Sequence, residues 1–223
     1  MPTIIMVRHG ESVANKDLRF SGEYADPQLT ELGHIQAKIT AKYLVRCFEG
    51  TTSNKIIVWT SPFLRTIQTA EPFIKLAGNM VRKVESIQLL QEYTTSNNSL
   101  TPHLRKDFCI QHKQWSDFTN QLFLLNELLR ETYYNLKEDE TLIIFGHSLV
   151  ISTLLTYYIS GERVMNTCID DTSIQIPNCA ITCLKPREET SWLILATGSI
   201  SHLPAKFVTG SRTPFNVHQD VLY

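Results

Sequence analysis

Three continuous apolar runs constrain the fold of this chain more than any other feature of its sequence. They occupy Thr3 to Val7, Ile56 to Trp59 and Leu142 to Phe145, and each stops abruptly at polar residues. The runs are β-branched or aromatic in character and do not alternate with polar positions. This is typical of strands that are buried on both faces of a largely parallel sheet. We therefore expect three strands that lie between layers of helices.

A helix is expected after the first run, beginning next to Thr30. Thr30 has the side chain of an N-cap, because its hydroxyl can accept a hydrogen bond from the first helical turn. Leu32, Ile35, Ile39 and Tyr43 then recur at helical spacing. The pattern predicts that these four residues form the face that packs on the core.

Further helices are expected between and after the other runs. Phe63 to Leu76 follows Pro62, but Pro72 lies inside this stretch and predicts a kink or break near Glu71. A second helix is expected over Val150 to Ile159, ending at Gly161. The apolar face of a long helix before the third run comprises Trp115, Phe118, Leu122, Leu125 and Leu129.

The C-terminal third predicts a hairpin at a sheet edge. Ala180 to Leu184 and Trp192 to Ala196 flank a polar connection over Pro186 to Ser191. Strands that alternate with helices indicate an α/β fold, here a three-layer α/β/α sandwich with a mostly parallel central sheet and an antiparallel edge. No repeat, low-complexity tract or long linker divides the chain, so residues 1–223 are expected to form a single domain.

Charge and composition exclude several function classes. The chain has 21 Lys and Arg against 22 Asp and Glu, which gives no general attraction for nucleic acid or an anionic membrane. Its 5 cysteines form no CxxC pair and favour free thiols in a reducing compartment. No segment approaches the roughly 20 apolar residues of a membrane span, and the first apolar run is too short for a signal peptide. We expect a cytoplasmic protein without nucleic-acid or membrane partners.

Cations or potential cations follow all three predicted strands. Arg8 and His9 follow the first run, Arg65 lies one turn into the helix after the second, and His147 follows the third. In open α/β sheets the ligand crevice lies outside the carboxyl ends of the strands, so these side chains should converge. A phosphoryl group requires fixed positive charge and N–H donors around its oxygens. The sequence therefore predicts a phosphate-binding site.

Several motifs contain these residues. The first is Arg8-His9-Gly10-Glu11, continued by Ser12 and Asn15. Together the motifs resemble the signature of the histidine phosphatase (phosphoglycerate-mutase-like) superfamily, in the family's order and over nearly the whole chain. The resemblance implies a phosphoglycerate-mutase-like fold. The other matches are Arg19-Phe20-Ser21-Gly22, Leu29-Thr30-Glu31-Leu32-Gly33 with Gln36-Ala37, Ser61-Pro62 with Arg65 and Gln68-Thr69-Ala70, Leu89 with Glu92, Gly146-His147, and Ser201-His202-Leu203.

The resemblance implies a role for each matching residue. His9 resembles the nucleophile that becomes phosphohistidine, and Glu92 stands at the position of the general acid, for which Glu85 and the acidic residues further along the chain are alternatives. Arg8, Arg65 and His147 correspond to the residues that hold the phosphoryl group. No metal and no cofactor are implied, because arginines supply the positive charge. Further substrate contacts are implied for Asn15, Ser21 and Gly22, and Ser148, where the family usually has glycine, offers an additional hydroxyl.

The chemistry agrees with a nucleophilic histidine. An imidazole attacks only when it is neutral, and Arg8 and Arg65 beside His9 favour that form. The other ring nitrogen needs a hydrogen-bond acceptor, which the backbone at Gly10 has room to supply.

The remaining histidines do not have the spacing of metal ligands. Packing or support of the site is expected for His202. Surface or structural roles are expected for His34, His103, His112 and His218.

The residues after Glu92 favour hydrolysis over isomerisation. The mutase branch has Arg-His-Tyr-Gly after the acid and a long insertion before the second histidine, whereas this chain has Tyr93-Thr94-Thr95-Ser96 and a short interval. We therefore expect a phosphomonoester hydrolase. A phosphoglycerate-type mutase is the first alternative. A catalytically weak phospho-ligand-binding module is the second, and the retention of the complete catalytic set argues against it.

Substrate choice is expected to depend on residues 93–114, a variable segment that matches no branch of the family. A solvated surface is the favoured interpretation of its basic residues, and a basic lip for a second phosphate or a carboxylate is the alternative. A small phosphorylated metabolite is the expected substrate, with a phosphoprotein as the alternative. The basic residues are His103, Arg105, Lys106, His112 and Lys113.

Overall fold

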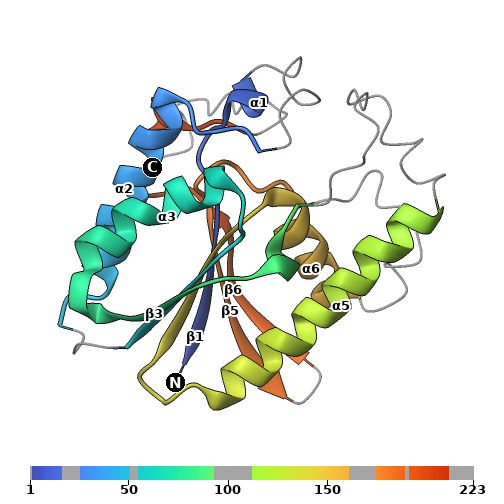
Figure 1. Ribbon diagram of the computed structural model, residues 1–223. Helices are drawn as coiled ribbons and strands as arrows, with labels where there is room; N and C mark the ends of the chain where they lie inside the picture. The colour runs from blue at the N-terminus through green and yellow to red at the C-terminus, as the bar shows by residue number, and fades with distance from the viewer. Residues whose placement is uncertain are drawn as a thin grey trace, which may run out of the picture.

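The computed structural model describes residues 2–16, 26–50, 55–92, 112–160, 174–188 and 191–210, with the backbone alone for 112–117, 160 and 188. Strands and helices alternate through most of these residues (Figure 1). The strands are β1 (Thr3–Arg8), β2 (Ile56–Thr60), β3 (Val81–Ser86), β4 (Thr141–Gly146), β5 (Ile181–Glu188) and β6 (Ser191–Ser199). The helices are α1 (Val13–Lys16), α2 (Glu31–Cys47), α3 (Leu64–Ala77), α5 (His112–Asn135) and α6 (Ser148–Ser160), with short 3-10 turns η2 (Gly78–Met80), η3 (Gln88–Leu90) and η6 (Ala205–Phe207).

One sheet contains all six strands, in the order β3-β2-β4-β1-β5-β6. Strands β1 to β4 are parallel to one another, whereas β5 pairs antiparallel with β1 and β6 antiparallel with β5. The three apolar runs are the adjacent strands β2, β4 and β1, and the hairpin is the edge β5-β6, as predicted. Strand β3 was not predicted, because an exposed edge strand such as Val81–Ser86 carries no continuous apolar run.

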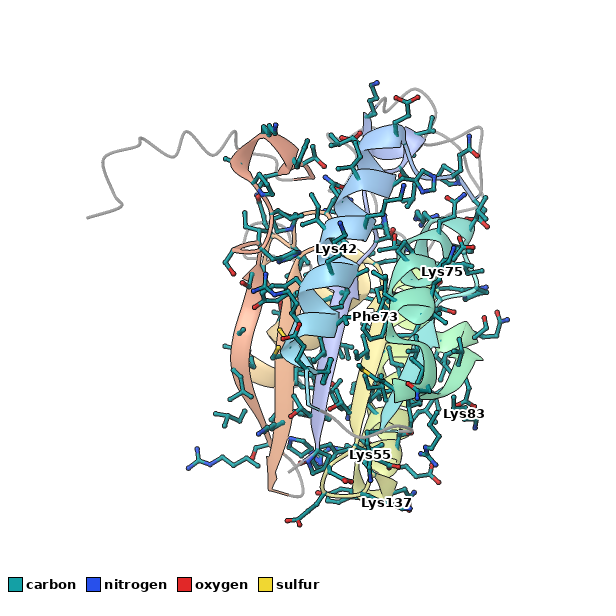
Figure 2. The ribbon with its side chains drawn as sticks, turned by 90° about the vertical axis from the view of Figure 1, so that its left-hand side faces the viewer. Lys42, Lys55, Phe73, Lys75, Lys83 and Lys137 are labelled. Carbon is teal, nitrogen blue, oxygen red and sulfur yellow. The ribbon has the colours of Figure 1, made fainter. Side chains whose placement is uncertain are left out.

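Helices cover both faces of the sheet (Figure 1). On β1, Val7 packs in a cluster with α2 and α3, and its neighbour Met6 packs in a second cluster with α5 and α6. Figure 2 shows Phe73 reaching from α3 toward the sheet, where its ring centroid lies 6.1 Å from that of Phe145. The predicted three-layer α/β/α sandwich is confirmed. Because the central strands β1, β2 and β4 are covered on both faces, each carries a continuous apolar run.

The predicted core face of α2 is wrong, although its start is right. Thr30 is the N-cap, and its Oγ1 accepts a hydrogen bond from the N–H of Gly33 at 3.0 Å. However, Ile35 and Tyr43 are 42% and 40% exposed. Helix α2 packs against both the sheet and α3, and small residues permit that close approach. The buried residues of the helix are Gly33, Gln36, Ala37, Thr40, Ala41 and Leu44.

The other predicted helices are present. Helix α3 runs from Leu64 to Ala77 with Pro72 inside it, so of the predicted kink or break near Glu71 the break does not occur. Helix α6 ends at Ser160, next to the predicted end. In the part of the chain that the structure describes, no helix combines the length and apolar character needed to cross a bilayer. The predicted face of α5 is buried at Phe118, Leu122, Leu125 and Leu129, and the side chain of Trp115 lies outside the described residues.

Candidate active site

The carboxyl ends of the central strands are joined by backbone hydrogen bonds. The N–H of His9, just after β1, donates to the carbonyl of Gly146 at 3.0 Å. The N–H of Ser61, just after β2, donates to the carbonyl of Phe145 at 3.0 Å. The residues that follow β1, β2 and β4 therefore lie at one edge of the sheet, and His147 follows β4 directly. The predicted convergence of strand ends is confirmed.

His9 is held in a single tautomer. Its Nδ1 lies 2.7 Å from the carbonyl oxygen of Gly10. A carbonyl can only accept, so Nδ1 carries the proton and Nε2 presents a lone pair. Arg65 Nε donates to that Nε2 at 3.3 Å. A Cβ on Gly10 would lie 2.7 Å from the carbonyl oxygen of Gly33, so only glycine fits in this loop beside α2.

His9 is buried and neutral. His9 is only 2% exposed, and this burial lowers the pKa of its imidazole well below 6.5. The charges of Arg8 and Arg65, and His147, lower that pKa further. At neutral pH the imidazole is therefore unprotonated at Nε2. A neutral imidazole with an unprotonated Nε2 has the form that a nucleophile requires.

His147 lies beside His9 and is completely buried. The two ring centroids are 5.3 Å apart in an edge-to-face arrangement. His147 Nε2 lies 2.8 Å from Ser61 Oγ, and burial lowers the pKa of His147 to about 3 against the opposing charge of Glu92. The second imidazole of the site is neutral as well.

Two guanidinium groups supply fixed positive charge. Arg8 Nη1 donates to the carbonyl oxygens of Ile176 at 2.6 Å and Gly210 at 3.1 Å. Burial lowers the pKa of Arg8 to about 10, which leaves it charged at neutral pH. Arg65 is 6% exposed and lies over the Phe63 ring at 4.8 Å. Both arginines are therefore fixed next to the neutral imidazoles.

Three buried nitrogens of this site lack a hydrogen-bond partner among the described residues. They are Arg8 Nε, Arg65 Nη1 and His147 Nδ1. Buried donors are normally paired, since an unpaired one costs about 1–3 kcal/mol. Donors on two guanidinium groups are suited to the oxygens of a tetrahedral anion. The arrangement can therefore bind a phosphoryl group.

Within the described ranges, two carboxylates contact these residues, Asp26, whose Oδ1 lies 3.7 Å from Arg65 Nη1, and Glu92. Its Oε2 lies 3.3 Å from Arg65 Nη2 and 3.5 Å from His147 Nδ1, and its Oε1 accepts from the N–H of Leu149 at 3.3 Å. Burial favours a raised pKa, but His147, Arg65 and Arg8 together hold the pKa of Glu92 below 4.5. The alternative acid, Glu85, instead accepts from Trp59 Nε1 and pairs with Lys83.

His9, Glu92 and His147 together have the donor atoms of a metal site. Ligand atoms of His9, Glu92 and His147 lie within 4.8 Å of one another. Two neutral imidazoles and a carboxylate form a common zinc ligand set. Here, however, the guanidinium groups of Arg8 and Arg65 are adjacent, and their charge opposes a divalent cation while it favours an anion.

Two of the predicted substrate contacts lie next to the site. Asn15 Oδ1 accepts hydrogen bonds from the N–H of Ser12 at 3.2 Å and from Asn178 Nδ2 at 3.1 Å. The Ser148 hydroxyl donates to the carbonyl of Ile176 at 3.5 Å, the same carbonyl that accepts from Arg8. Ser21, Gly22 and residues 93–111 of the variable segment, including Arg105 and Lys106, lie outside the described residues.

Sequence reasoning missed residues that support the site from behind. Asn178 Nδ2 donates to the carbonyl of His9 at 3.0 Å, and the N–H of Gly10 donates to Thr69 Oγ1 at 2.9 Å. Thr69 stands in a recognised motif without an assigned role. The only signal for Asn178 is its place after Pro177, in a turn just before strand β5.

His202 has the packing role that was predicted for it. Its Nε2 lies 2.9 Å from Thr40 Oγ1, and its ring stacks on Tyr43 with centroids 5.0 Å apart. Burial lowers the pKa of His202 to about 4.

Comparison with known proteins agrees with this geometry. The sequence model of the histidine phosphatase superfamily (branch 1) matches residues 4–122. No curated protein sequence matches the chain significantly. Among solved structures, phosphoglycerate mutase from Bacillus anthracis is 18% identical, with 90% of this chain and 94% of that chain covered and a TM-score of 0.65.

Two phosphatases have the same fold. A mutant of phosphoserine phosphatase from Entamoeba histolytica, in complex with phosphoserine, is 21% identical, with coverage of 92% and 100% and a TM-score of 0.61. A mycobacterial glucosyl-3-phosphoglycerate phosphatase is 19% identical, with coverage of 88% and 98% and a TM-score of 0.61. The predicted phosphoglycerate-mutase-like fold is therefore confirmed. The chain belongs to the histidine phosphatase superfamily.

Proposed function

We propose that this protein is an enzyme that hydrolyses phosphomonoesters through a phosphohistidine on His9. One observation carries the proposal: a buried, neutral imidazole presents Nε2 toward Arg65, next to unpaired N–H donors of two guanidinium groups. Arg8, Arg65 and His147 hold the phosphoryl oxygens. The positive charge of the arginines balances the charge of the transferring group, so no metal or cofactor takes part.

In the first step, His9 Nε2 attacks phosphorus in line with the ester bond. An N–P bond forms while the P–O ester bond breaks, and its electron pair leaves with the alkoxide oxygen. Glu92 donates a proton to that oxygen, so the leaving group departs as an alcohol. The Nδ1–H of His9 keeps its hydrogen bond to Gly10 and stabilises the positive charge that develops on the ring.

Glu92 is ionised before substrate binds, since its pKa is held below 4.5. A phosphoryl group adds negative charge beside this carboxylate and neutralises part of the charge on Arg8 and Arg65. Both effects raise the pKa of Glu92, so the carboxyl can take a proton from solvent and act as the acid. In the second step it accepts a proton from water, which attacks phosphorus and returns the N–P electron pair to His9 Nε2.

A small phosphorylated metabolite is the proposed substrate. The sequence after Glu92 differs from that of mutases, and two structurally similar proteins are named as phosphatases. The balanced net charge offers no attraction for polyanionic partners. We also propose a cytoplasmic location. A phosphoglycerate-type mutase is the second candidate, since a protein of that name is among the similar structures.

The test uses purified protein with EDTA, an aryl phosphate and a panel of metabolite phosphates, and measures free phosphate. We expect release from at least one substrate, and we expect His9→Ala to abolish it. His34→Ala, on helix α2 away from these residues, is the matched control and should leave release unchanged. Interconversion of phosphate isomers without release would establish the mutase, and binding without turnover would establish a regulatory module.

The variable segment is tested on the same panel. If a basic lip at Arg105 and Lys106 binds a second anionic group, alanine at both positions raises KM for dianionic metabolites more than for the aryl phosphate. An unchanged KM across all anionic substrates would show that these residues form a solvated surface.

A further inference from the structure

A chain of side-chain hydrogen bonds behind the site begins at Glu11. The backbone N–H of Glu11 donates to Gln36 Oε1 at 2.7 Å. A backbone N–H can only donate, so this contact fixes which end of the Gln36 amide carries the oxygen. Gln36 Nε2 therefore donates outward, to Thr209 Oγ1 at 2.8 Å and to the carbonyl of Phe207 at 2.7 Å.

The chain continues through Thr209 to Asn178. The Thr209 hydroxyl accepts from Gln36 and donates its own proton to Asn178 Oδ1 at 3.2 Å. Asn178 is completely buried, and its Nδ2 donates to the carbonyl of His9 at 3.0 Å and to Asn15 Oδ1 at 3.1 Å. Because a carbonyl only accepts, the His9 contact independently sets the same orientation of the Asn178 amide.

The chain ends at the amide of Asn15. Its Oδ1 accepts two N–H donors, from Asn178 and from the backbone of Ser12 at 3.2 Å. The NH₂ group of Asn15 is therefore turned away from both and remains available as a donor. Every bond from Glu11 to Asn15 has the same direction, so each group polarises the next. Reversal of any one amide would place donor against donor.

The segment after β6 completes this arrangement. Gly210 has a φ of +76°, and its carbonyl oxygen accepts a hydrogen bond from Arg8 Nη1. A Cβ there would lie 2.2 Å from Asn178 Oδ1 and 2.6 Å from Arg8 Nη1. The backbone of Thr209 also accepts from the N–H of Asn178 at 2.9 Å. Gly210 therefore contacts Arg8, and Thr209 contacts Asn178, which in turn donates to Asn15.

We propose that Gln36, Thr209 and Asn178 are positioning residues that orient the Asn15 amide so that its NH₂ group donates to a phosphoryl oxygen. The inference rests on the proposed function for the identity of the ligand. Asn15 is exposed on a short helix, and a free amide there would rotate. The rotated amide would present its oxygen to the anion, which exchanges an attractive contact for a repulsive one.

The experiment measures the affinity of the full-length protein for inorganic phosphate by calorimetry, so it does not depend on turnover. Thr209→Val keeps the side-chain shape but removes the hydroxyl from the chain. We expect this change to weaken phosphate binding by about 3–10-fold, the size of one hydrogen bond. Thr209→Ser, which retains the hydroxyl, should bind within about twofold of the unsubstituted protein.

A double-mutant cycle with Asn15→Ala separates positioning from a general structural role. If Thr209 acts through Asn15, Thr209→Val changes phosphate affinity no further once Asn15 is alanine. Equal losses in both backgrounds would overturn the inference. Asn178→Asp gives a second readout. A carboxylate cannot donate to Asn15 Oδ1 and attracts the NH₂ group of Asn15 instead. The Asn178→Asp variant should therefore bind phosphate more weakly than the Asn178→Ala variant.

The two proposals fail in different ways. Phosphate binding with the expected coupling but no hydrolysis of any monoester would contradict the proposed function and support the positioning role. Hydrolysis with additive affinity losses would contradict the positioning role alone. Thermal unfolding of every variant establishes that the protein is folded, and Thr209→Val carries the test if Asn178→Asp does not fold.

Discussion

At the scale of single residues, Glu92 differs from the other charged groups because it must change protonation during the proposed reaction. It lies against Arg65 and His147 and is 25% exposed at its side chain, so solvent can exchange its proton. His9 and the arginines keep one protonation state until phosphorus is attacked. The rate of the first step should therefore depend on Glu92 only to the extent that the leaving oxygen needs a proton.

Glu92→Gln tests this dependence. For an alkyl phosphate, whose alkoxide is a poor leaving group, we expect kcat/KM, which reports formation of the phosphohistidine, to fall by about 10²–10⁴-fold. For p-nitrophenyl phosphate, whose leaving group needs little help, the loss should be much smaller. Steady-state kinetics on both substrates measures the difference. Equal losses on the two substrates would contradict an acid role, and Glu85→Gln, outside these contacts, should show neither loss.

Much of the candidate site could be predicted from single residues. Arg8, His9, Arg65 and His147 stand at strand ends and in recognisable motifs, so their convergence follows from the parallel sheet. Asn178 could not be predicted as a site residue, because its contact with Asn15 depends on a turn far along the chain. Ser21 and Gly22 stay predictions.

At the scale of elements, helix α2 connects stability to the loop after His9. Thr30 Oγ1 caps the helix by accepting from Gly33 and also donates to Glu11 Oε1 at 2.7 Å. The ends of helices leave N–H groups without intrahelical partners, and the cap satisfies one of them. A Cβ on Gly33 would lie 2.1 Å from the Glu11 carbonyl oxygen, which shows how closely the helix approaches the loop.

Thr30→Ala should lower the free energy of unfolding by about 1 kcal/mol, within a range of roughly 0.5–2, because it removes the cap. Urea denaturation measures the change. Thr30→Ser keeps the hydroxyl and serves as the control. If alanine and serine have the same stability as the natural residue, the Thr30 hydroxyl does not stabilise the helix.

Element type was more predictable than element orientation. Strands β1, β2 and β4 follow from continuous apolar runs, and α5 follows from its stripe. The face of α2 did not follow, because small residues such as Ala37 and Ala41 face the core where α2 packs closely, and Ile35 remains outside. Hydrophobic periodicity depends only on the hydrophobicity of each side chain and contains no information about how near the neighbouring helix lies.

At the scale of the whole molecule, the site costs stability at acid pH. The pKa of His9 is lowered well below 6.5 and that of His147 to about 3, whereas histidines of the unfolded chain titrate near 6.5. Between these values the unfolded state binds more protons than the folded state. The free energy of unfolding should therefore fall as the pH decreases below 6.5 and be independent of these groups above it.

Urea denaturation at pH 7, 6 and 5 measures this slope. Each buried histidine contributes up to about 1.4 kcal/mol per pH unit once the pH is below 6.5. His147→Gln should reduce the slope by the equivalent of one proton, whatever its effect on stability at pH 7. A slope that His147→Gln leaves unchanged would show that His147 is protonated to the same extent in both states.

The overall architecture was predictable because the strand pattern is dense and local. Sheet order and the approach of the C-terminal segment were not, since both depend on contacts between distant parts of the chain. Thr209 and Gly210, which reach Asn178 and Arg8, follow no apolar pattern and no recognised motif. Their placement follows only from the packed structure.

The most direct test of the whole account is the identity of the phosphorylated atom. The protein is quenched in alkali during turnover of a phosphomonoester, since phosphohistidine is stable there, and is then digested and analysed by mass spectrometry and ³¹P NMR. We expect one phosphorylated residue, His9, with phosphorus on Nε2, because Nδ1 donates to Gly10. Phosphorus on Nδ1, on another residue, or on no residue during active turnover would contradict it.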